Sequence, residues 1–133
     1  MKELFIDAKT ENVTPVLEFV ETELSKSDCS ERSKIHIGIA VEEIFINISN
    51  YAYRPDVGDV KIRIGVSDYV CIEFEDKGKP FNPLEKEDPD ISAEIDEREI
   101  GGLGIFMVKK IMDAVEYRYE NNKNILVIRK VLD

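Results

Sequence analysis

The sequence predicts an α+β sandwich of two layers, with helices packed on one face of a mainly antiparallel, mixed sheet. Two observations lead to this prediction. Apolar residues recur at helical spacing in some segments and alternate with polar residues in others. The segments follow one another as strand, helix, helix, two strands, loop, helix and two strands, so helices and strands are interleaved. At 133 residues the chain fits a single domain, residues 1–133, with one core.

The first half is predicted to contain one strand and two helices. Residues 2–8 alternate weakly, which favours a strand. The next segment has a helical repeat in which Pro15 fits only the first turn; its apolar positions are Val13, Val16, Leu17, Val20 and Leu24. Ser30 or Ser33 can cap a second, long helix, which continues to about Tyr53 and stops at Arg54-Pro55-Asp56.

The second half is predicted to contain two hairpins, a long loop and one helix. Residues 60–66 and 70–75 alternate on either side of a tight turn, so this hairpin has one buried face. Residues 77–100 contain prolines and many acids without clear periodicity, and a loop of that length in a small domain is commonly a functional lid, here over about 82–100. A helix over 102–114 and a hairpin of 115–119 with 125–131 complete the chain.

The composition excludes several classes of function. A formal net charge of -10 and a pI near 4.7 argue against nucleic acid or an anionic membrane as the main partner, and favour a basic partner or an anion bridged by a cation. Cys29 and Cys71 show neither metal-ligand spacing nor the density of a disulfide scaffold. Since there is also no apolar leader and no apolar segment of about 20 residues, we expect a reduced cytoplasmic protein.

The most informative stretch is a run of glycines just before the last predicted helix. Gly101, Gly102 and Gly104 fall within four residues. Glycines allow backbone N–H groups to approach an anion, and the dipole and free amides at the start of a helix favour negative charge. The run therefore indicates a phosphate site, although glycines at such a turn also arise for packing alone.

A polar stripe on the long helix is the second signal. Four polar residues fall within a sector about 60° wide at about 100° per residue: His36, Glu43, Asn47 and Asn50. The stripe is expected to lie between two apolar flanks, Ala40, Ile44 and Tyr51 on one side and Ile35, Ile39 and Ile46 on the other, with Gly38, Glu42 and Ser49 facing solvent. The carboxamide oxygen of Asn47, together with phosphate oxygens, could bind Mg²⁺. The alternative interpretation is that Glu43 and Asn47 only form a hydrogen-bonded pair on the helix surface.

Asp76 is the third signal. Strand parity places it on the buried face of its strand, so a carboxylate ends the strand pointing inward. Gly78 lets the chain turn beside a flat ligand, and a fixed carboxylate can accept a hydrogen bond from an exocyclic amine such as that of adenine. The alternative is an ordinary Asp-x-Gly turn.

Together these signals resemble a known family over nearly the whole chain. The order and approximate spacing are those of the nucleotide-binding boxes of the GHKL superfamily, which covers gyrase-type ATPases and histidine-kinase catalytic domains: Glu43-x-x-x-Asn47, Asp76-x-Gly78-x-Pro80-Phe81 and Gly101-Gly102-Leu103-Gly104. The compact length and the two phrases 41–53 and 101–117 look most like the bacterial anti-sigma factor serine/threonine kinases. The resemblance implies the Bergerat-type ATP-binding fold.

The resemblance also implies roles for individual residues. Glu43 matches the general base for a serine or threonine hydroxyl, and Asn47 matches the Mg²⁺ ligand. Asp76 with Gly78 matches the adenine end of an ATP site. The phosphates would meet the loop of Gly101, Gly102, Leu103 and Gly104, with Asn50 also among the nucleotide-binding residues and Arg98 the candidate for the γ-phosphate.

Some positions depart from the family pattern. Asn50 and Tyr51 stand where relatives often carry a basic residue and a histidine, so there is less positive charge near the phosphates. The segment from Asn82 to Ile100 holds eight acids against Lys86 and Arg98, which is either a solvated, self-repelling loop or a docking surface for a basic partner.

Three functional hypotheses follow. The resemblance implies first an ATP-dependent serine/threonine kinase, a homodimer, that phosphorylates an anti-anti-sigma (STAS-type) protein and sequesters a sigma factor. The second is a nucleotide-gated binding module with little or no kinase activity. The third is a histidine-kinase catalytic fragment. The lack of a preceding helix pair with a phosphoacceptor histidine argues against this hypothesis.

Overall fold

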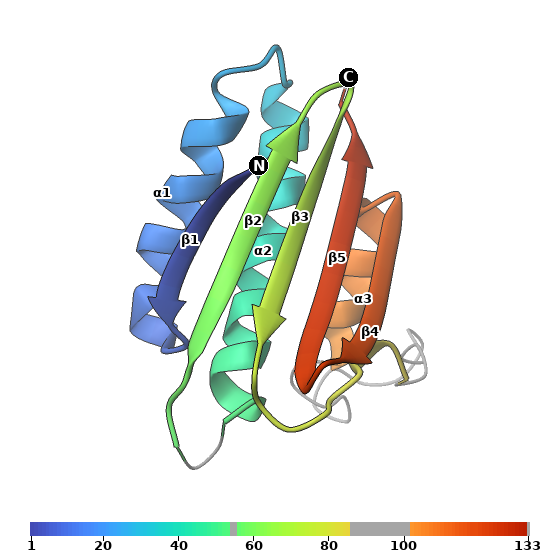
Figure 1. Ribbon diagram of the computed structural model, residues 1–133. Coiled ribbons are helices and arrows are strands. Elements are labelled where there is room, and N and C mark those ends of the chain that lie inside the picture. Colours follow the sequence, from blue (N-terminus) through green and yellow to red (C-terminus); the bar gives the residue numbers. More distant parts are fainter. Residues whose placement is uncertain (54–55, 86–101, 133) are drawn as a thin grey trace.

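The computed structural model describes residues 1–53, 56–85 and 102–132, and within these ranges five strands form one sheet whose single covered face carries three α-helices (Figure 1). The strands are β1 (Lys2–Asp7), β2 (Asp59–Val66), β3 (Tyr69–Asp76), β4 (Ala114–Glu120) and β5 (Lys123–Val131), and the helices are α1 (Val13–Leu24), α2 (Glu31–Tyr51) and α3 (Gly102–Ile111). Two short 3-10 turns, η1 (Thr10–Asn12) and η2 (Pro83–Glu85), precede α1 and follow β3. The predicted fold class is confirmed.

The sheet order is β1-β2-β3-β5-β4, and every pairing among the described strands is antiparallel. No parallel pair of a mixed sheet is present in the described part of the chain. The β4–β5 hairpin turns at Asn121 and Asn122, which have φ of 54° and 61°. Asparagine tolerates this left-handed conformation better than most residues, and two such residues in a row suit the tight turn predicted there.

The helix boundaries lie close to those predicted. Pro15 is the third residue of α1 and so lies in its first turn, as expected. Ser30, not Ser33, caps α2, because its Oγ accepts a hydrogen bond from the Ser33 backbone N–H at 3.1 Å. Both α2 and α3 end two to three residues earlier than the sequence pattern indicated.

The core lies between the helices and the sheet. Alternate residues of β2 and β3 point into it, and α2 contributes its central face between α1 and α3; the largest fully buried side chains include Phe45, Phe74, Ile37, Ile44, Ile62 and Ile72. The expectation that Ile35 and Ile39 form a buried flank of α2 is wrong: 59% and 40% of their surfaces are exposed. They lie roughly 160° around the helix from Ile37, on the side away from the sheet.

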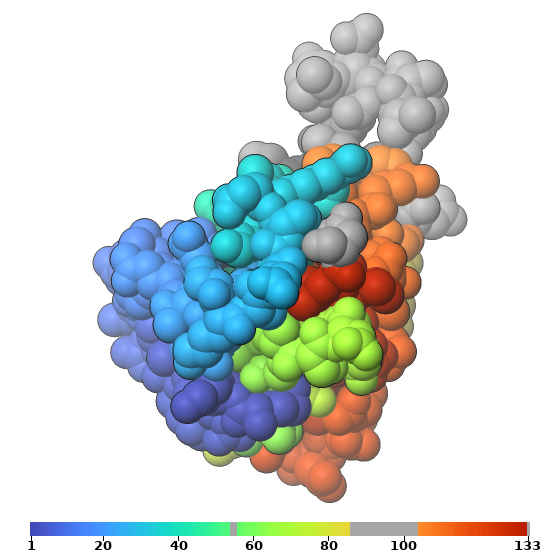
Figure 2. Space-filling model, turned by 90° about the horizontal axis from the view of Figure 1, so that it is seen from above, coloured from blue at the N-terminus to red at the C-terminus, as the bar shows by residue number. Residues whose placement is uncertain are grey.

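The two ends of the sandwich differ. At the upper end, seen from above in Figure 2, the β2–β3 turn packs beside the end of β5, and the Leu132 N–H donates to the Asp68 carbonyl at 3.1 Å. At the lower end, Tyr53 joins three segments, because its hydroxyl donates to the Asp59 carbonyl at 2.6 Å and accepts from the Lys77 N–H at 2.8 Å. Gly58 lies under the Tyr53 ring, where a Cβ would come within 2.2 Å of the ring. The candidate site is at this lower end.

Candidate functional site

A largely apolar pocket opens where the C-terminal half of α2 meets the end of β3, the start of α3 and the β4–β5 hairpin. The apolar lining consists of Ile44, Ile48, Ala52, Phe74, Phe81, Pro83, Ile105 and Leu126, with the ring of Tyr117, and the polar lining of Asn47, Asp76 and Asn124. A slot with apolar walls and few polar groups suits a flat heteroaromatic ring.

Asp76 lies at the inner end of this pocket and is buried, as strand parity predicted. Its Oδ1 accepts hydrogen bonds from the Gly78 N–H and from Asn124 Nδ2, both at 2.9 Å. No described residue donates to Oδ2. Burial raises the pKa of Asp76, and the hydrogen bonds from Asn124 and Gly78 act in the opposite direction. The arrangement therefore presents one unpaired carboxylate oxygen, in a desolvated position, to a ligand that carries a donor.

Asn124 lines the pocket and was not predicted from the sequence. It pairs with Asp76 across β3 and β5. Its Nδ2 donates to Asp76 and, at 2.9 Å, to the Lys79 carbonyl, while its Oδ1 accepts from the Phe81 N–H at 3.1 Å and from the Tyr117 hydroxyl. One side chain thus fixes the carboxylate and the segment after β3 together. The alternation of side chains along β5 could have indicated that Asn124 points inward, because it lies on the helix-facing side of the strand with Leu126 and Ile128.

Gly78 is required by a close approach of two backbones. A Cβ at this position would lie 2.2 Å from the Ala52 carbonyl oxygen at the C-terminal end of α2. That carbonyl accepts a hydrogen bond from the Lys79 N–H at 3.0 Å, so the segment after β3 is held against the helix end. Gly78 accordingly allows the segment after β3 to pack against α2, which is a structural reason for the glycine in addition to the chain turn expected from the sequence.

Asn47 lines the same pocket from α2 and is buried. Its carboxamide forms no hydrogen bond with any described residue, although buried amides normally have partners. The carboxamide is therefore available to a ligand or to a cation that a ligand brings. No cluster of three or more His, Cys, Asp or Glu side chains suited to a metal ion occurs within the described ranges.

Glu43 lies one turn before Asn47 and faces the start of α3. A Cβ built on Gly104 would fall 2.0 Å from the Glu43 carboxyl carbon, so the carboxylate rests directly on the glycine. Burial raises the pKa of Glu43, and the neighbouring charge of Glu42 raises it further. Glu42 itself is exposed, as the helical-face argument predicted, and Glu43 is the acid that faces the site.

Other predicted site residues are placed as follows. Asn50 is exposed on α2 and does not line the pocket, and Tyr51 stacks on Phe81 with ring centroids 5.6 Å apart. Gly102 opens α3, but its surroundings and the side chain of Leu103 are not described. Gly101, Arg98 and most of the predicted lid lie outside the described residues, which resume at 102 after Glu85. The structure thus brings together Glu43, Asn47, Asp76, Gly78 and Gly104.

This combination of an α+β sandwich and a pocket between α2, α3 and the end of β3 defines a class. The chain belongs to the family of histidine kinase-like ATPase domains, whose model matches residues 6–130. The resemblance drawn from the three sequence motifs is confirmed.

Within that class, the chain is similar to proteins named serine-protein kinase RsbW. It is 30% identical to the one from Bacillus cereus strain AH187 over 98 residues, which are 70% of this chain and 61% of that protein. The corresponding protein of Bacillus mycoides strain KBAB4 is 29% identical over the same share. The chain therefore spans about three-fifths of the length of these curated relatives.

Solved structures show the same fold at low sequence identity. The crystal structure of the RsbU and RsbW domains of Rv1364c from Mycobacterium tuberculosis matches 99% of this chain and 33% of that one, with a TM-score of 0.66 and 14% identity. The Acinetobacter baumannii histidine kinase AdeS matches all of this chain and 70% of that one, with a TM-score of 0.56 and 13% identity. Among the described residues, no helix is both long and apolar enough to span a membrane.

Proposed function

We propose that this chain binds ATP with Mg²⁺ and is a serine/threonine protein kinase that phosphorylates an anti-anti-sigma (STAS-type) partner and sequesters a sigma factor in the cytoplasm, working as a homodimer. The observation that carries the proposal is one apolar pocket lined by both Asp76, with an open carboxylate oxygen, and Asn47, which lies one helical turn from the Glu43 carboxylate that rests on Gly104. Similarity to proteins named serine-protein kinase supports the reaction type.

The adenine would occupy the apolar part of the pocket. Its exocyclic amine would donate to the unpaired Oδ2 of Asp76, while the ring contacts Phe74, Ile105 and Leu126. Asn124 and Gly78 already hold the other carboxylate oxygen, so Asp76 needs no reorganisation when the ring enters.

The phosphates would then lie toward Asn47 and the first turn of α3. The Asn47 carboxamide lines the pocket and bonds to no described residue, so its oxygen could be a ligand for Mg²⁺, which would neutralise charge on the phosphates. The free amides and the dipole at the N-terminus of α3, which begins at Gly102, would favour the phosphates.

Glu43 would accept the proton of the substrate hydroxyl. In this step the hydroxyl oxygen forms a bond to the γ-phosphorus, the bond from that phosphorus to the bridging oxygen breaks, and ADP leaves. A pKa raised by burial and by Glu42 makes Glu43 a stronger base than a solvated glutamate. Phosphoryl transfer depends mainly on such positioning and electrostatics.

Binding can be tested first, without a protein substrate. Isothermal titration of ATP should show tighter binding with Mg²⁺ than with EDTA, and Asn47→Ala should abolish that difference. Asn50→Ala is the matched control: it changes the same residue type on the same helix, but outside the pocket, and should keep the Mg²⁺ effect. Affinity that ignores both Mg²⁺ and Asn47→Ala would overturn the site.

Transfer is tested with [γ-³²P]ATP and the purified anti-anti-sigma proteins of the same genome. The wild type should label one of them, Glu43→Gln should lower the rate by about a hundred-fold or more, and Glu42→Gln should keep most of it. ATP binding without transfer to any of these proteins would favour the second candidate, a nucleotide-gated binding module. The stacking of Tyr51 on Phe81, in place of a cation near the phosphates, is the observation that favours this candidate.

A further inference from the structure

An apolar patch on the helix layer adjoins Glu43 and is not used by the core. It consists of Ile35 and Ile39 of α2 and Met107 of α3, which are 59%, 40% and 42% exposed. The other large hydrophobic side chains exposed in the described ranges lie elsewhere, at the N-terminus, in the loop before β2 or on the strands. These three therefore form the apolar surface of the helical side.

The patch runs up to the Glu43 carboxylate. Ile39 precedes Glu43 by one turn, about 6 Å along the axis and about 40° around it, and Ile35 lies one turn further. Helices α2 and α3 run in opposite directions (Figure 1), and Gly104 of α3 touches Glu43. Met107, one turn into α3, consequently lies on the same side of Glu43 as Ile39.

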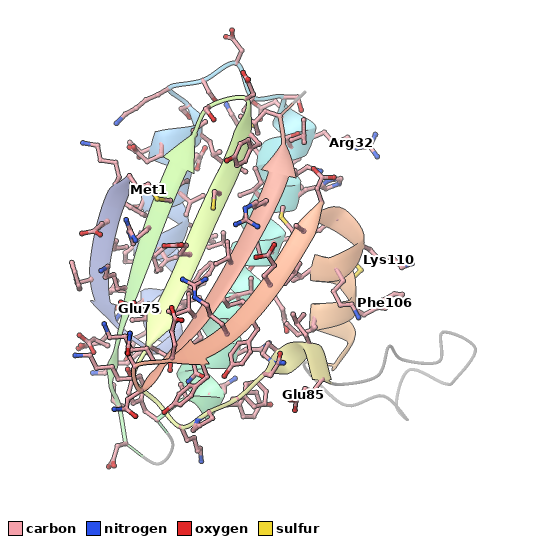
Figure 3. All side chains as sticks on the ribbon, turned by 45° about the vertical axis from the view of Figure 1, so that its right-hand side comes forward. Met1, Arg32, Glu75, Glu85, Phe106 and Lys110 are labelled. Atoms are coloured by element: carbon pink, nitrogen blue, oxygen red, sulfur yellow. The ribbon has the colours of Figure 1, made fainter. Side chains whose placement is uncertain are left out.

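The rim of the patch carries both signs of charge: the exposed Glu31 and Glu42 lie one turn from Ile35 and Ile39, whereas the side of the patch towards α3 is basic. Arg32 lies one turn before Ile35, and Lys110 lies one turn after Met107 with its Nζ 5.3 Å from the centre of the Phe106 ring. Figure 3 shows Arg32, Phe106 and Lys110 projecting on the side of α3. Neither Arg32 nor Lys110 forms an ion pair with any described residue, so both charges are available to an acidic group.

We propose that this patch is the docking surface for the protein substrate: a folded protein with an exposed apolar surface, acidic groups beside it and the serine or threonine that is delivered to Glu43. The proposal rests on the proposed kinase function for the identity of the partner. A protein that brings a hydroxyl to Glu43 must cover the surface around that residue, and this surface is apolar with basic residues on the side towards α3. Apolar contact would supply affinity and the two cations would steer the encounter.

The test compares Ile35→Ala/Ile39→Ala and Met107→Ala with Val131→Ala, an exposed residue on the opposite face of the sheet. These truncations add no charge near Glu43, and alanine favours helix, so folding should be retained and is checked by thermal melting. With the anti-anti-sigma protein as substrate, the helix variants should raise KM by about ten-fold or more, whereas Val131→Ala and the affinity for ATP should not change.

Two further measurements separate docking from chemistry. A short peptide carrying the same serine cannot cover the patch, so its kcat/KM should be the same for wild type and for the truncated variants. Arg32→Gln/Lys110→Gln should slow association with the protein substrate and weaken its dependence on salt.

An unchanged KM in the truncated variants would overturn the docking surface. So would a loss of transfer accompanied by a change of oligomeric state in light scattering, because a second copy of the chain would then occupy the patch. If the wild type labels no anti-anti-sigma protein, the kinase function fails and calorimetry of binding to the same proteins decides: binding weakened by the truncations supports the patch, whereas unweakened or absent binding overturns it.

Discussion

Replacing Gly104 by alanine tests whether a glycine is required there by its contact with Glu43. The contact has to be distinguished from the general effect of replacing a helical glycine by alanine. The new methyl would lie 2.0 Å from the carboxyl carbon and from one oxygen of Glu43, whereas ordinary contact begins at 3.4 Å. The carboxylate must therefore retreat by about 1.4 Å, since it is the flexible partner. Gly38 in α2 is the matched control, because a Cβ there meets nothing within 4 Å.

The expected magnitudes differ between the two sites. Alanine in a helix interior is favoured over glycine by about 1 kcal/mol, so Gly38→Ala should raise the free energy of unfolding by about that amount. At position 104 the gain should be cancelled by the displaced and strained Glu43, at about 0.5–1.5 kcal/mol for an off-rotamer side chain. A displacement of about 1 Å can cost a hundred-fold in rate, so transfer by Gly104→Ala should fall by about that factor.

Urea unfolding measures the stability difference, and single-turnover transfer from labelled ATP measures the rate. The stability result does not depend on the proposed reaction. A Gly104→Ala protein that gains as much stability as Gly38→Ala and transfers phosphate as fast as the wild type would refute the contact between Glu43 and Gly104 as the reason for the glycine.

Three further predictions concern the same end of the molecule. Asn124→Ala leaves the Lys79 carbonyl, the Phe81 N–H and the Tyr117 hydroxyl without their Asn124 partner. The free energy of unfolding in urea should therefore fall by about 1–3 kcal/mol, and ATP binding should weaken. Unchanged values of both quantities would contradict this hydrogen-bond network. Tyr53→Phe removes the hydrogen bonds to Asp59 and from Lys77 and should cost about 1–2 kcal/mol in the same assay, and a loss well below this would show that the hydroxyl does not join the three segments. Because burial and then Glu42 raise the pKa of Glu43 above its usual 4.5, the folded state holds its proton to higher pH than the unfolded state, and stability falls as pH rises through the raised value. Glu43→Gln should therefore be more stable than the wild type at a pH above the raised pKa, with a difference that shrinks as the pH falls through that value towards 4.5. A difference independent of pH would disprove the raised pKa.

Local patterns were sufficient to predict most of the fold. The hairpins follow from alternation around short turns, and the Asn121–Asn122 turn adopts the left-handed backbone that its residues favour. The exposed isoleucines of α2 were not predictable in the same way. Helical angles order residues around an axis, but which sector meets the sheet depends on how α1 and α3 flank the helix, and this is a tertiary property.

The candidate site was predictable to the extent that it lies within single motifs. Asp76 and Asn47 could be placed from strand parity and helical spacing, since each signal lies on one element. Asn124 could not, because its role comes from the β3–β5 register, which joins residues 48 positions apart. The structural reason for Gly78, the Ala52 carbonyl, likewise comes from another element.

The two ends of the pocket differ in how far they are prepared for a ligand. At the Asp76 end one carboxylate oxygen is already held in place, because Asn124 is bonded to it and to the segment after β3, and the other oxygen is left for the ligand. At the Asn47 end the carboxamide has no partner within the described residues, and a carboxylate rests on the first turn of a helix. Preorganisation lowers the cost of binding a ring at the first end. At the Asn47 end, the carboxamide without a partner and the nearby Glu43 carboxylate should make the binding of phosphates depend on a cation. The effect of Mg²⁺ on ATP binding by Asn47→Ala therefore tests the site more sharply than the affinity for ATP alone.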